Sequence, residues 1–263
     1  MANMSELDLL LQNAVAWARE AGEIQLKYFR GTELHIQAKL NQYDVVTVAD
    51  KESERLIISH IHSCYPSHSI LSEESGVENN SDEWQWVIDP LDGTTNYSSG
   101  LPLFSISIGI RHNGETVVGV VYAPYLNELF TAVKGIGAFL NGKAIKVREL
   151  DDLSQAVIST GFPVDKAATS DNNLDNATRV LPLVRGFRRL GSAAVDISYV
   201  ASGVLDAYWE LNLHEWDVCA GILIAKEAGA MVHHFRNDRN VSVLVASPNI
   251  GAKILPLLST NPG

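Results

Sequence analysis

Three features that are scarce or missing in the sequence narrow the class of protein. Its 263 residues include only two cysteines, Cys64 and Cys219, which offer no disulfide framework and favour a reducing compartment. No apolar run approaches the ~20 residues that a membrane-spanning helix needs. The N-terminal residues are acidic and lack the basic stretch of a signal peptide. We therefore expect a cytoplasmic protein that does not act at a membrane.

Positive charge is also scarce. Lysine and arginine total 20 residues against 31 aspartates and glutamates, which gives a formal net charge of −11. Binding to nucleic acid without sequence preference requires a basic surface, so we expect no nucleic-acid partner. Acidic side chains can also be gathered to hold cations, and the net charge alone does not distinguish such a site from a solvated surface.

Hydrophobic periodicity predicts both helices and strands in the first half of the chain. Apolar residues at helical spacing predict a helix over residues 5–29, and Asp50 precedes a second helix that stops at Pro66. The Asn113-Gly114 pair between two β-rich segments is typical of a hairpin. Strands are expected at 45–48, 69–72, 84–88, 104–112 and 116–124.

The second half alternates strands with helices. We expect strands at 156–160 and 205–210, and helices at 173–185, from near Ser192, and from just before Asp217 to Gly229. This alternation predicts α/β or α+β layers. A boundary near 148–154 would separate residues 1–150 from 151–263, with the two halves completing one catalytic unit.

The stretch WVIDPLDGTTNY, residues 86–97, bears most directly on function. Asp89 ends an apolar strand, Pro90 cannot extend a paired central strand, and Gly93 permits a sharp turn. Two carboxylates three residues apart, Asp89 and Asp92, can converge across such a turn. The backbone amides that follow would then face an anion. Carboxylates beside an anion site act together when hard divalent cations such as Mg²⁺ bridge them.

Other interpretations of this stretch were weighed. An isolated D-P-x-D-G match is also typical of a plain turn. A helix–loop–helix calcium site is excluded, because Leu91 and Gly100 stand where oxygen ligands are needed. A phosphatase with a nucleophilic aspartate would need the spacing D-x-D-G-T, which is one residue shorter.

Further acidic residues stand at other element ends. Glu73 and Glu74 follow a strand, and Asp217 lies in the first turn of a helix. Taken alone, the first two could form a solvated loop, and the third could simply favour the helix dipole. Their conjunction with Asp89 and Asp92 is more informative than any one of them.

Several segments in the same order resemble the inositol monophosphatase family, and they cover most of the chain. The most specific are the DPLDGTTN and WD motifs. The resemblance implies a layered αβαβα fold of the α+β class and a homodimer. It also implies Mg²⁺-dependent, lithium-sensitive hydrolysis of a small phosphomonoester by metal-activated water. The segments are DVVTVAD (44–50), SEES (72–75), WVIDPLDGTTNY (86–97), GVVYAP with GIGAFLNG (119–142) and LGSAAVDISYVASGVLDAYWELNLHEWD (190–217).

The resemblance also implies roles for individual residues. Two to three Mg²⁺ ions would be held by Glu73, Asp89, the Leu91 carbonyl oxygen, Asp92 and Asp217. Glu73, Thr94 and Asp50 would be catalytic. Substrate contacts would come from Gly93, Thr94, Gly191, Ser192, Ala193 and Glu210, with Lys39 as a loop contact. Two positions depart from the family pattern: Ser72 replaces a glycine, and Glu215 replaces a neutral residue.

The sequence favours one substrate class and leaves others open. DGTTN differs from the lysine-containing motif of the nucleotide-bisphosphate branch, and Glu210 favours an inositol-type polyol. Histidinol phosphate or another small phosphomonoester remains an alternative, and a non-catalytic regulatory descendant is a second one. The basic cluster at 185–190 could line a subunit or substrate surface, but surface salt bridges are its ordinary role.

Overall fold

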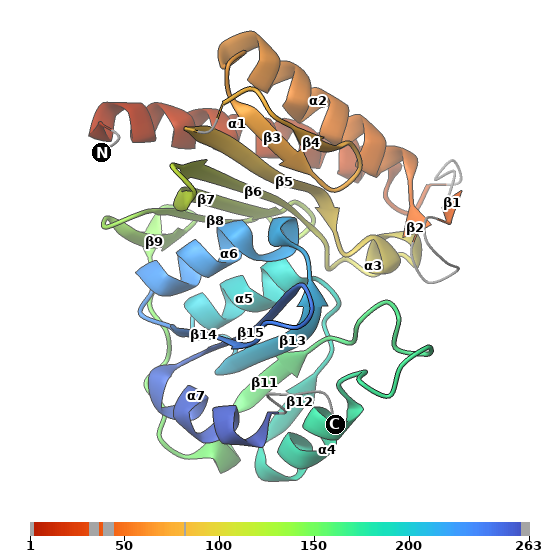
Figure 1. Ribbon diagram of the computed structural model, residues 1–263, viewed down its shortest axis with the longest axis vertical. Coiled ribbons are helices and arrows are strands. Elements are labelled where there is room, and N and C mark those ends of the chain that lie inside the picture. The colour runs from red at the N-terminus through yellow and green to blue at the C-terminus, as the bar shows by residue number, and fades with distance from the viewer. Residues whose placement is uncertain (1–2, 32–36, 39–44, 82, 259–263) are drawn as a thin grey trace.

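The computed structural model describes residues 3–31, 37–38, 45–81 and 83–258. In these residues helices and sheets stack in five layers, in the order helix, sheet, helix, sheet, helix (Figure 1). The layered α+β fold expected from the sequence is confirmed. None of the described helices is both long enough and apolar enough to cross a bilayer.

The first layer consists of α1 (Met4–Tyr28) and α2 (Val48–Cys64), which pack on the first sheet around Trp86, Ile106 and Ile108. The helix predicted over 5–29 is confirmed to within one residue at each end. α2 begins before Asp50, because the Thr47 side chain caps it and the Thr47 backbone N–H donates to Asp50 Oδ2 at 2.9 Å. Asp50 therefore lies inside the first helical turn and does not precede the helix.

The second layer is an eight-stranded sheet in the order β10-β9-β8-β7-β6-β5-β3-β4. Its neighbours are antiparallel except for β3 and β5. The strands are β3 (Ser69–Ser72), β4 (Gly76–Glu78), β5 (Trp84–Asp92), β6 (Ser105–His112), β7 (Glu115–Ala123), β8 (Glu128–Val133), β9 (Gly137–Leu140) and β10 (Lys143–Ala144). A separate antiparallel pair is formed by β1 (Gln37–Ala38) and β2 (Val45–Val46).

The predicted hairpin joins β6 to β7. Its two loop residues, Asn113 and Gly114, have φ angles of 51° and 79°, as the mirror-image turn of a two-residue hairpin requires. His112 pairs with Glu115 across the turn. The Asn-Gly signal is therefore confirmed.

The middle layer contains α5 (Ala193–Ala201) and α6 (Glu215–Glu227). α6 comes from the second half of the chain but packs on the sheet of the first half. Two glycines permit this approach. A Cβ at Gly119 would lie 2.7 Å from the Ala220 carbonyl oxygen, and a Cβ at Gly109 would lie 3.1 Å from the Cys219 Cβ. The two halves are thus tightly packed together, and the proposed boundary near 148–154 stays a prediction.

The second sheet has the order β12-β11-β13-β15-β14 and is covered on its outer face by α4 and α7 (Figure 1). Its apolar core against the outer helices includes Ile158, Trp209 and Ile250. The elements are β11 (Val157–Thr160), α4 (Leu174–Val180), β12 (Gly186–Arg188), β13 (Ala207–Leu213), β14 (Met231–Arg236), β15 (Val241–Ala246) and α7 (Pro248–Ile254). Short 3₁₀ turns lie at Leu153–Gln155, Leu181–Leu183 and Leu255–Leu257.

Two further predicted element ends were wrong. β5 does not stop at Asp89 but runs to Asp92, with a register shift between these residues that takes Pro90 out of the regular ladder. The helix predicted over 173–185 is shorter in the structure. It consists of α4, which ends at Val180, and a 3₁₀ turn that contains Pro182 follows it. Proline lacks the N–H that a continuing α-helix requires.

Candidate active site

The turn between β5 and α3 (Thr94–Ser98) brings two distant segments together. Gly93 caps α3 with a φ of 95°. A Cβ at this position would lie 3.0 Å from the Leu103 carbonyl oxygen and 3.2 Å from the Gly191 carbonyl oxygen. Glycine is therefore required both by the left-handed backbone and by the close approach of the chain near residue 191.

Asp89 and Asp92 precede this turn, and both are buried. Oδ1 of Asp89 accepts a hydrogen bond from the Leu91 amide at 2.9 Å. Oδ2 of Asp92 accepts one from the Ser192 hydroxyl at 2.6 Å and one from the Ala194 amide at 2.7 Å. The N-terminal turn of α5 thus holds a carboxylate from the first half of the chain.

Thr94 lies between two of the residues predicted to act with it. Its hydroxyl is 3.1 Å from Asp50 Oδ1 and 3.0 Å from the Leu91 carbonyl oxygen. The other Asp50 oxygen accepts hydrogen bonds from the amide and the hydroxyl of Thr47. Burial raises the pKa of Asp50 to about 6, with a smaller contribution from the negative charge of Glu73.

Glu73 occupies the turn between β3 and β4. Its backbone N–H donates to the Ile88 carbonyl oxygen at 3.2 Å, which fixes the turn beside the end of β5. The Glu73 carboxyl group lies within hydrogen-bonding reach of Asp89. The structure therefore brings together these two residues, which lie on separate elements.

Asp217 stands in the first turn of α6. Its Oδ2 accepts a hydrogen bond from the His214 amide at 2.7 Å, so that it caps the helix while its charge lies near the other acidic residues. Burial, followed by the charges of Asp92 and Glu73, raises the pKa of Asp217 well above the ordinary range.

The acidic groups of β5 are affected in the same way. Burial, together with the charges of Glu73, Asp92 and Asp217, raises the pKa of Asp89 well above its ordinary value. Burial raises the pKa of Asp92 to about 6, against the lowering effect of its hydrogen bonds from Ser192 and Ala194. Asp89, Asp92 and Asp217 thus share one low-dielectric region beside the charge of Glu73, and this setting disfavours the ionisation of the three aspartates.

The chemistry of this cluster fits Mg²⁺. All of its donors are carboxylate or carbonyl oxygens, which Mg²⁺ prefers, and a cation would offset the repulsion that the raised pKa values express. Within the described ranges, however, no group of three or more His, Cys, Asp or Glu side chains stands where it could hold a metal ion as it is. The carboxylates suit the ion in type and proximity, but they would have to converge further to ligate it.

A cavity of about 130 Å³ adjoins this cluster. It is lined by Asp92 and Asp217, and also by Gly191, Ala193 and Glu210. The site residues predicted from the second half of the chain therefore lie beside those from the first half. Burial raises the pKa of Glu210 to about 7, although the Tyr208 hydroxyl donates to its Oε2 at 2.5 Å.

Sequence reasoning missed four residues that line this cavity: Gly161, Arg189, Asp196 and Leu213. Arg189 belongs to the basic cluster at 185–190, and its charge acts on both Glu210 and Asp196. Asp196 is buried one helical turn beyond Ser192 on α5, a spacing that could have identified it. Gly161 gave no signal, because only the fold places it against Glu210.

The two departures from the family pattern have partners outside the cluster. The Ser72 hydroxyl donates to Glu54 on α2, and Glu215 forms an ion pair with Arg111. The added charge of Glu215 is thus directed toward a guanidinium group. Lys39, the predicted loop contact, lies outside the described residues.

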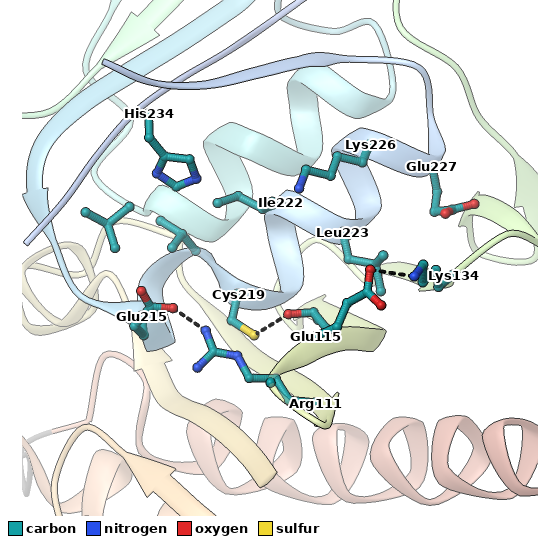
Figure 2. Close-up of a pocket in the computed structure, with 14 residues that line it drawn as sticks. Arg111, Glu115, Lys134, Glu215, Cys219, Ile222, Leu223, Lys226, Glu227 and His234 are labelled. Carbon is teal, nitrogen blue, oxygen red and sulfur yellow. Dashed lines mark hydrogen bonds and ion pairs between the residues drawn. The ribbon is translucent and has the colours of Figure 1, made fainter. Parts of the chain in front are cut away.

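A second cavity, of about 400 Å³, lies along α6 (Figure 2). Arg111, Glu215 and Cys219 line one part of it, and Lys226 and Glu227 line another. Charges of both signs are mixed around it, and it contains none of the predicted site residues. The carboxylate cluster and its smaller cavity are therefore the candidate active site.

A layered αβαβα fold that gathers buried carboxylates where its two halves meet defines a class of α+β phosphatases. Within that class, this chain belongs to the inositol monophosphatase family, whose model matches residues 6–261. The family assignment made from the motifs is confirmed.

Individual relatives agree with this assignment. The chain is 44% identical over 250 residues to a Vibrio cholerae protein named Nus factor SuhB, and the match covers 94% of both chains. It is 37% identical to the solved inositol monophosphatase from Anabaena (Nostoc) sp. PCC 7120, with a TM-score of 0.85 and 97% of both chains covered. The extragenic suppressor protein suhB from Bartonella henselae is 32% identical, with a TM-score of 0.86 and coverage of 95% of this chain and 98% of that one.

Proposed function

We propose that this protein is a Mg²⁺-dependent phosphatase that hydrolyses inositol monophosphate to myo-inositol and phosphate. The observation that carries the proposal is the meeting of Glu73, Asp89, Asp92 and Asp217 beside a cavity that contains Glu210. Membership of the family supports the phosphatase activity. The particular substrate rests on the position of Glu210.

Glu73, Asp89, the Leu91 carbonyl oxygen, Asp92 and Asp217 would hold two to three Mg²⁺ ions. Bound Mg²⁺ would neutralise the carboxylates and polarise the phosphate and the attacking water. Without such ions, up to five negative charges, including that of Asp50, would repel a phosphate dianion. Cations are thus expected to be needed for binding as well as for turnover.

The remaining residues position the reactants. The Thr94 hydroxyl, held between Asp50 and the Leu91 carbonyl oxygen, would orient the water together with Glu73. The water oxygen bonds to phosphorus in line with the departing alcohol oxygen, which takes up a proton as it leaves. The amides of Gly93 and Thr94 would receive the phosphate oxygens. No phosphoenzyme is expected, because the carboxylates are engaged with cations.

Glu210 would accept hydrogen bonds from the polyol hydroxyls, with Gly191, Ser192 and Ala193 forming the wall of the cavity beside it. The buried Glu210 carboxylate is a strong hydrogen-bond acceptor beside this cavity. Without it, the hydroxyls of the bound polyol would have no hydrogen-bond partner there. Lys39 would approach the substrate from its loop.

Assembly and location belong to the same proposal. We expect a homodimer in the cytoplasm with no nucleic-acid or membrane partner. The negative net charge of −11 supports the absence of a nucleic-acid partner. The free cysteines Cys64 and Cys219 support a reducing compartment. Lithium is expected to inhibit the enzyme.

A second candidate function is regulatory. Relatives from Vibrio cholerae and Escherichia coli, 44% and 41% identical, are named Nus factor SuhB. A protein that acts only by binding would have no need for its carboxylate cluster, and in this chain each expected acidic ligand is present. A regulatory role in addition to catalysis is compatible with that observation.

Phosphate release tests the proposal. Purified protein would be assayed with myo-inositol 1-phosphate, histidinol phosphate and an adenosine bisphosphate, each with Mg²⁺ and with EDTA. Mg²⁺-dependent release that is fastest from the inositol ester is the expected result. Faster phosphate release from another ester would keep the phosphatase assignment and change the proposed substrate to that ester. No phosphate release from any of the three esters would favour the regulatory function.

A further inference from the structure

Glu54 lies on α2, outside the residues assigned to the site, and is only 5% exposed. A buried carboxylate needs several hydrogen-bond donors to offset its lost hydration. In this protein the donors come from one short segment, the turn at residues 72–75, which carries Glu73.

The turn donates four hydrogen bonds to the Glu54 carboxylate. Oε1 accepts from the Ser72 hydroxyl, from the Glu74 amide at 3.2 Å and from the Ser75 amide at 3.1 Å. Oε2 accepts from the Ser75 hydroxyl at 2.6 Å. These donors precede and follow Glu73 in the chain, so Glu54 fixes the turn on both sides of the proposed metal ligand.

The turn joins β3 to the short strand β4. β4 contains only three residues, and Gly76, where it begins, has a left-handed φ of 77°. On the other side, the Glu73 amide is anchored to Ile88 on β5. Glu73 is thus held between the strand that carries Asp89 and the helix that carries Glu54.

A second residue of α2, Asp50, contacts another part of the site. Asp50 stands four residues before Glu54, one helical turn away, and accepts from the Thr94 hydroxyl. A single rigid helix therefore holds both Thr94 and the turn of Glu73 at a fixed separation.

We propose that Glu54 is a positioning residue for the metal centre, which sets the Glu73 turn through its hydrogen bonds and not through its charge. The proposal rests on the proposed role of Glu73 as a metal ligand. Residues that hold a metal ligand in place commonly change metal affinity about 10- to 100-fold when they are removed. Glu54→Ala is therefore expected to weaken Mg²⁺ binding by about 10-fold or more.

Glu54→Gln removes the negative charge of Glu54 but can keep its hydrogen bonds to the turn, so it distinguishes the effect of the hydrogen bonds from that of the charge. Its amide oxygen can take the three donors at Oε1, while its NH₂ group can donate to the Ser75 hydroxyl oxygen. Mg²⁺ affinity in this variant should stay within about threefold of the wild-type value. Glu52→Ala is the matched control, because Glu52 lies on the same helix and accepts from the Tyr28 hydroxyl instead of from the turn.

The experiment is isothermal titration of each protein with Mg²⁺ in the absence of substrate, with amide hydrogen exchange at Glu74 and Ser75 as a second readout. Loss of affinity and of amide protection in Glu54→Ala, with both retained in Glu54→Gln and Glu52→Ala, is the expected result. If Glu54→Ala does not fold, Ser75→Ala removes the hydroxyl that donates to Glu54 Oε2 and should weaken Mg²⁺ binding about 10-fold, whereas affinity within about threefold of the wild type would contradict the inference.

Three results would contradict the inference in distinguishable ways. Equal Mg²⁺ affinity in the wild type and in Glu54→Ala would overturn it and leave the proposed function standing, and so would equal losses in the Gln and Ala variants. A wild-type protein that binds no Mg²⁺ would overturn the proposed function and this inference with it.

Discussion

The Ser192 hydroxyl donates a 2.6 Å hydrogen bond to Asp92 Oδ2, although 100 residues separate the two in the chain. Ser192 also caps α5, where its Oγ accepts from the Val195 amide. One side chain thus orients a proposed metal ligand of the first half and starts a helix of the second. The candidate active site is complete only when the two halves are packed together.

This contact predicts the effect of Ser192→Ala. Without the hydroxyl, Asp92 loses a donor and α5 loses its cap. Turnover should fall about 10-fold or more, while the free energy of unfolding should fall by about 1 kcal/mol. Phosphate release and urea unfolding would measure the two effects.

Ser198→Ala is the control for that variant. Ser198 lies on the same helix, and its buried hydroxyl has no hydrogen-bond partner in the part of the chain that the structure describes. Removal of its hydroxyl should cost little stability and no activity. Equal losses in the two serine variants would show that the Asp92 contact has no special role.

Asp89→Asn is predicted to raise the stability of the metal-free protein and to abolish its activity. Asp89 is buried among Glu73, Asp92 and Asp217, so removal of its charge relieves repulsion in the metal-free protein. Asparagine can still accept from the Leu91 amide. The variant should be more stable than the wild type in EDTA by about 1 kcal/mol, yet it should gain little from added Mg²⁺ and should not turn over substrate.

Thermal unfolding of both proteins in EDTA and in Mg²⁺ would check this prediction. The wild type should melt at a higher temperature when Mg²⁺ is added, since a ligand that binds only the folded state stabilises it. A variant that is less stable than the wild type in EDTA and still responds to Mg²⁺ would contradict the assignment of Asp89 as a ligand.

His68 predicts a pH dependence of stability that is independent of the active site. Its Nδ1 accepts a hydrogen bond from Trp86 Nε1 at 3.0 Å, and its ring stacks on Tyr65 and Trp84. Burial lowers the pKa of His68 below the ordinary value of 6.5. As the pH falls through 6.5, the unfolded chain therefore takes up a proton before the folded chain does, and the free energy of unfolding decreases.

Urea unfolding at pH 7.5 and pH 5.5 would measure this effect. His68→Asn keeps an acceptor for Trp86 but cannot titrate, so its midpoint should fall less than that of the wild type between the two pH values. Parallel changes in both proteins would assign the pH dependence to other groups.

The local parts of the fold could be predicted from the sequence, because short-range chemistry determines them. Asn113-Gly114 specified its hairpin, and the apolar spacing of residues 5–29 specified α1. The end of β5 was predicted wrongly because a neighbouring element decides it: pairing with β6 carries β5 past Pro90 to Asp92. The start of α2 was predicted wrongly although its signal is local, since Thr47 caps the helix through Asp50, three residues further on.

The candidate site divides in the same way. The acidic residues were recognisable because each follows a strand or begins a helix within a specific motif. Arg189, Asp196 and Gly161 were not, because their importance depends on which segments meet at the cavity. Glu54 was also missed, because no spacing in the sequence relates it to the turn at 72–75.

Gly161 offers a test of the proposed role of Glu210 in substrate selection. Gly161 directly follows β11, and a Cβ at this position would overlap the Glu210 carboxylate. The carboxylate would have to move away from its hydrogen bond with the Tyr208 hydroxyl. Gly161→Ala should therefore raise KM for myo-inositol 1-phosphate about 10-fold, since a hydroxyl loses a charged acceptor. For p-nitrophenyl phosphate, which has no polyol hydroxyls, kcat/KM should change less than about twofold. Glu210→Gln should show the same selectivity. Equal losses on both esters in Gly161→Ala, without a change in melting temperature, would show that Gly161 acts on the phosphate side of the site and not through Glu210.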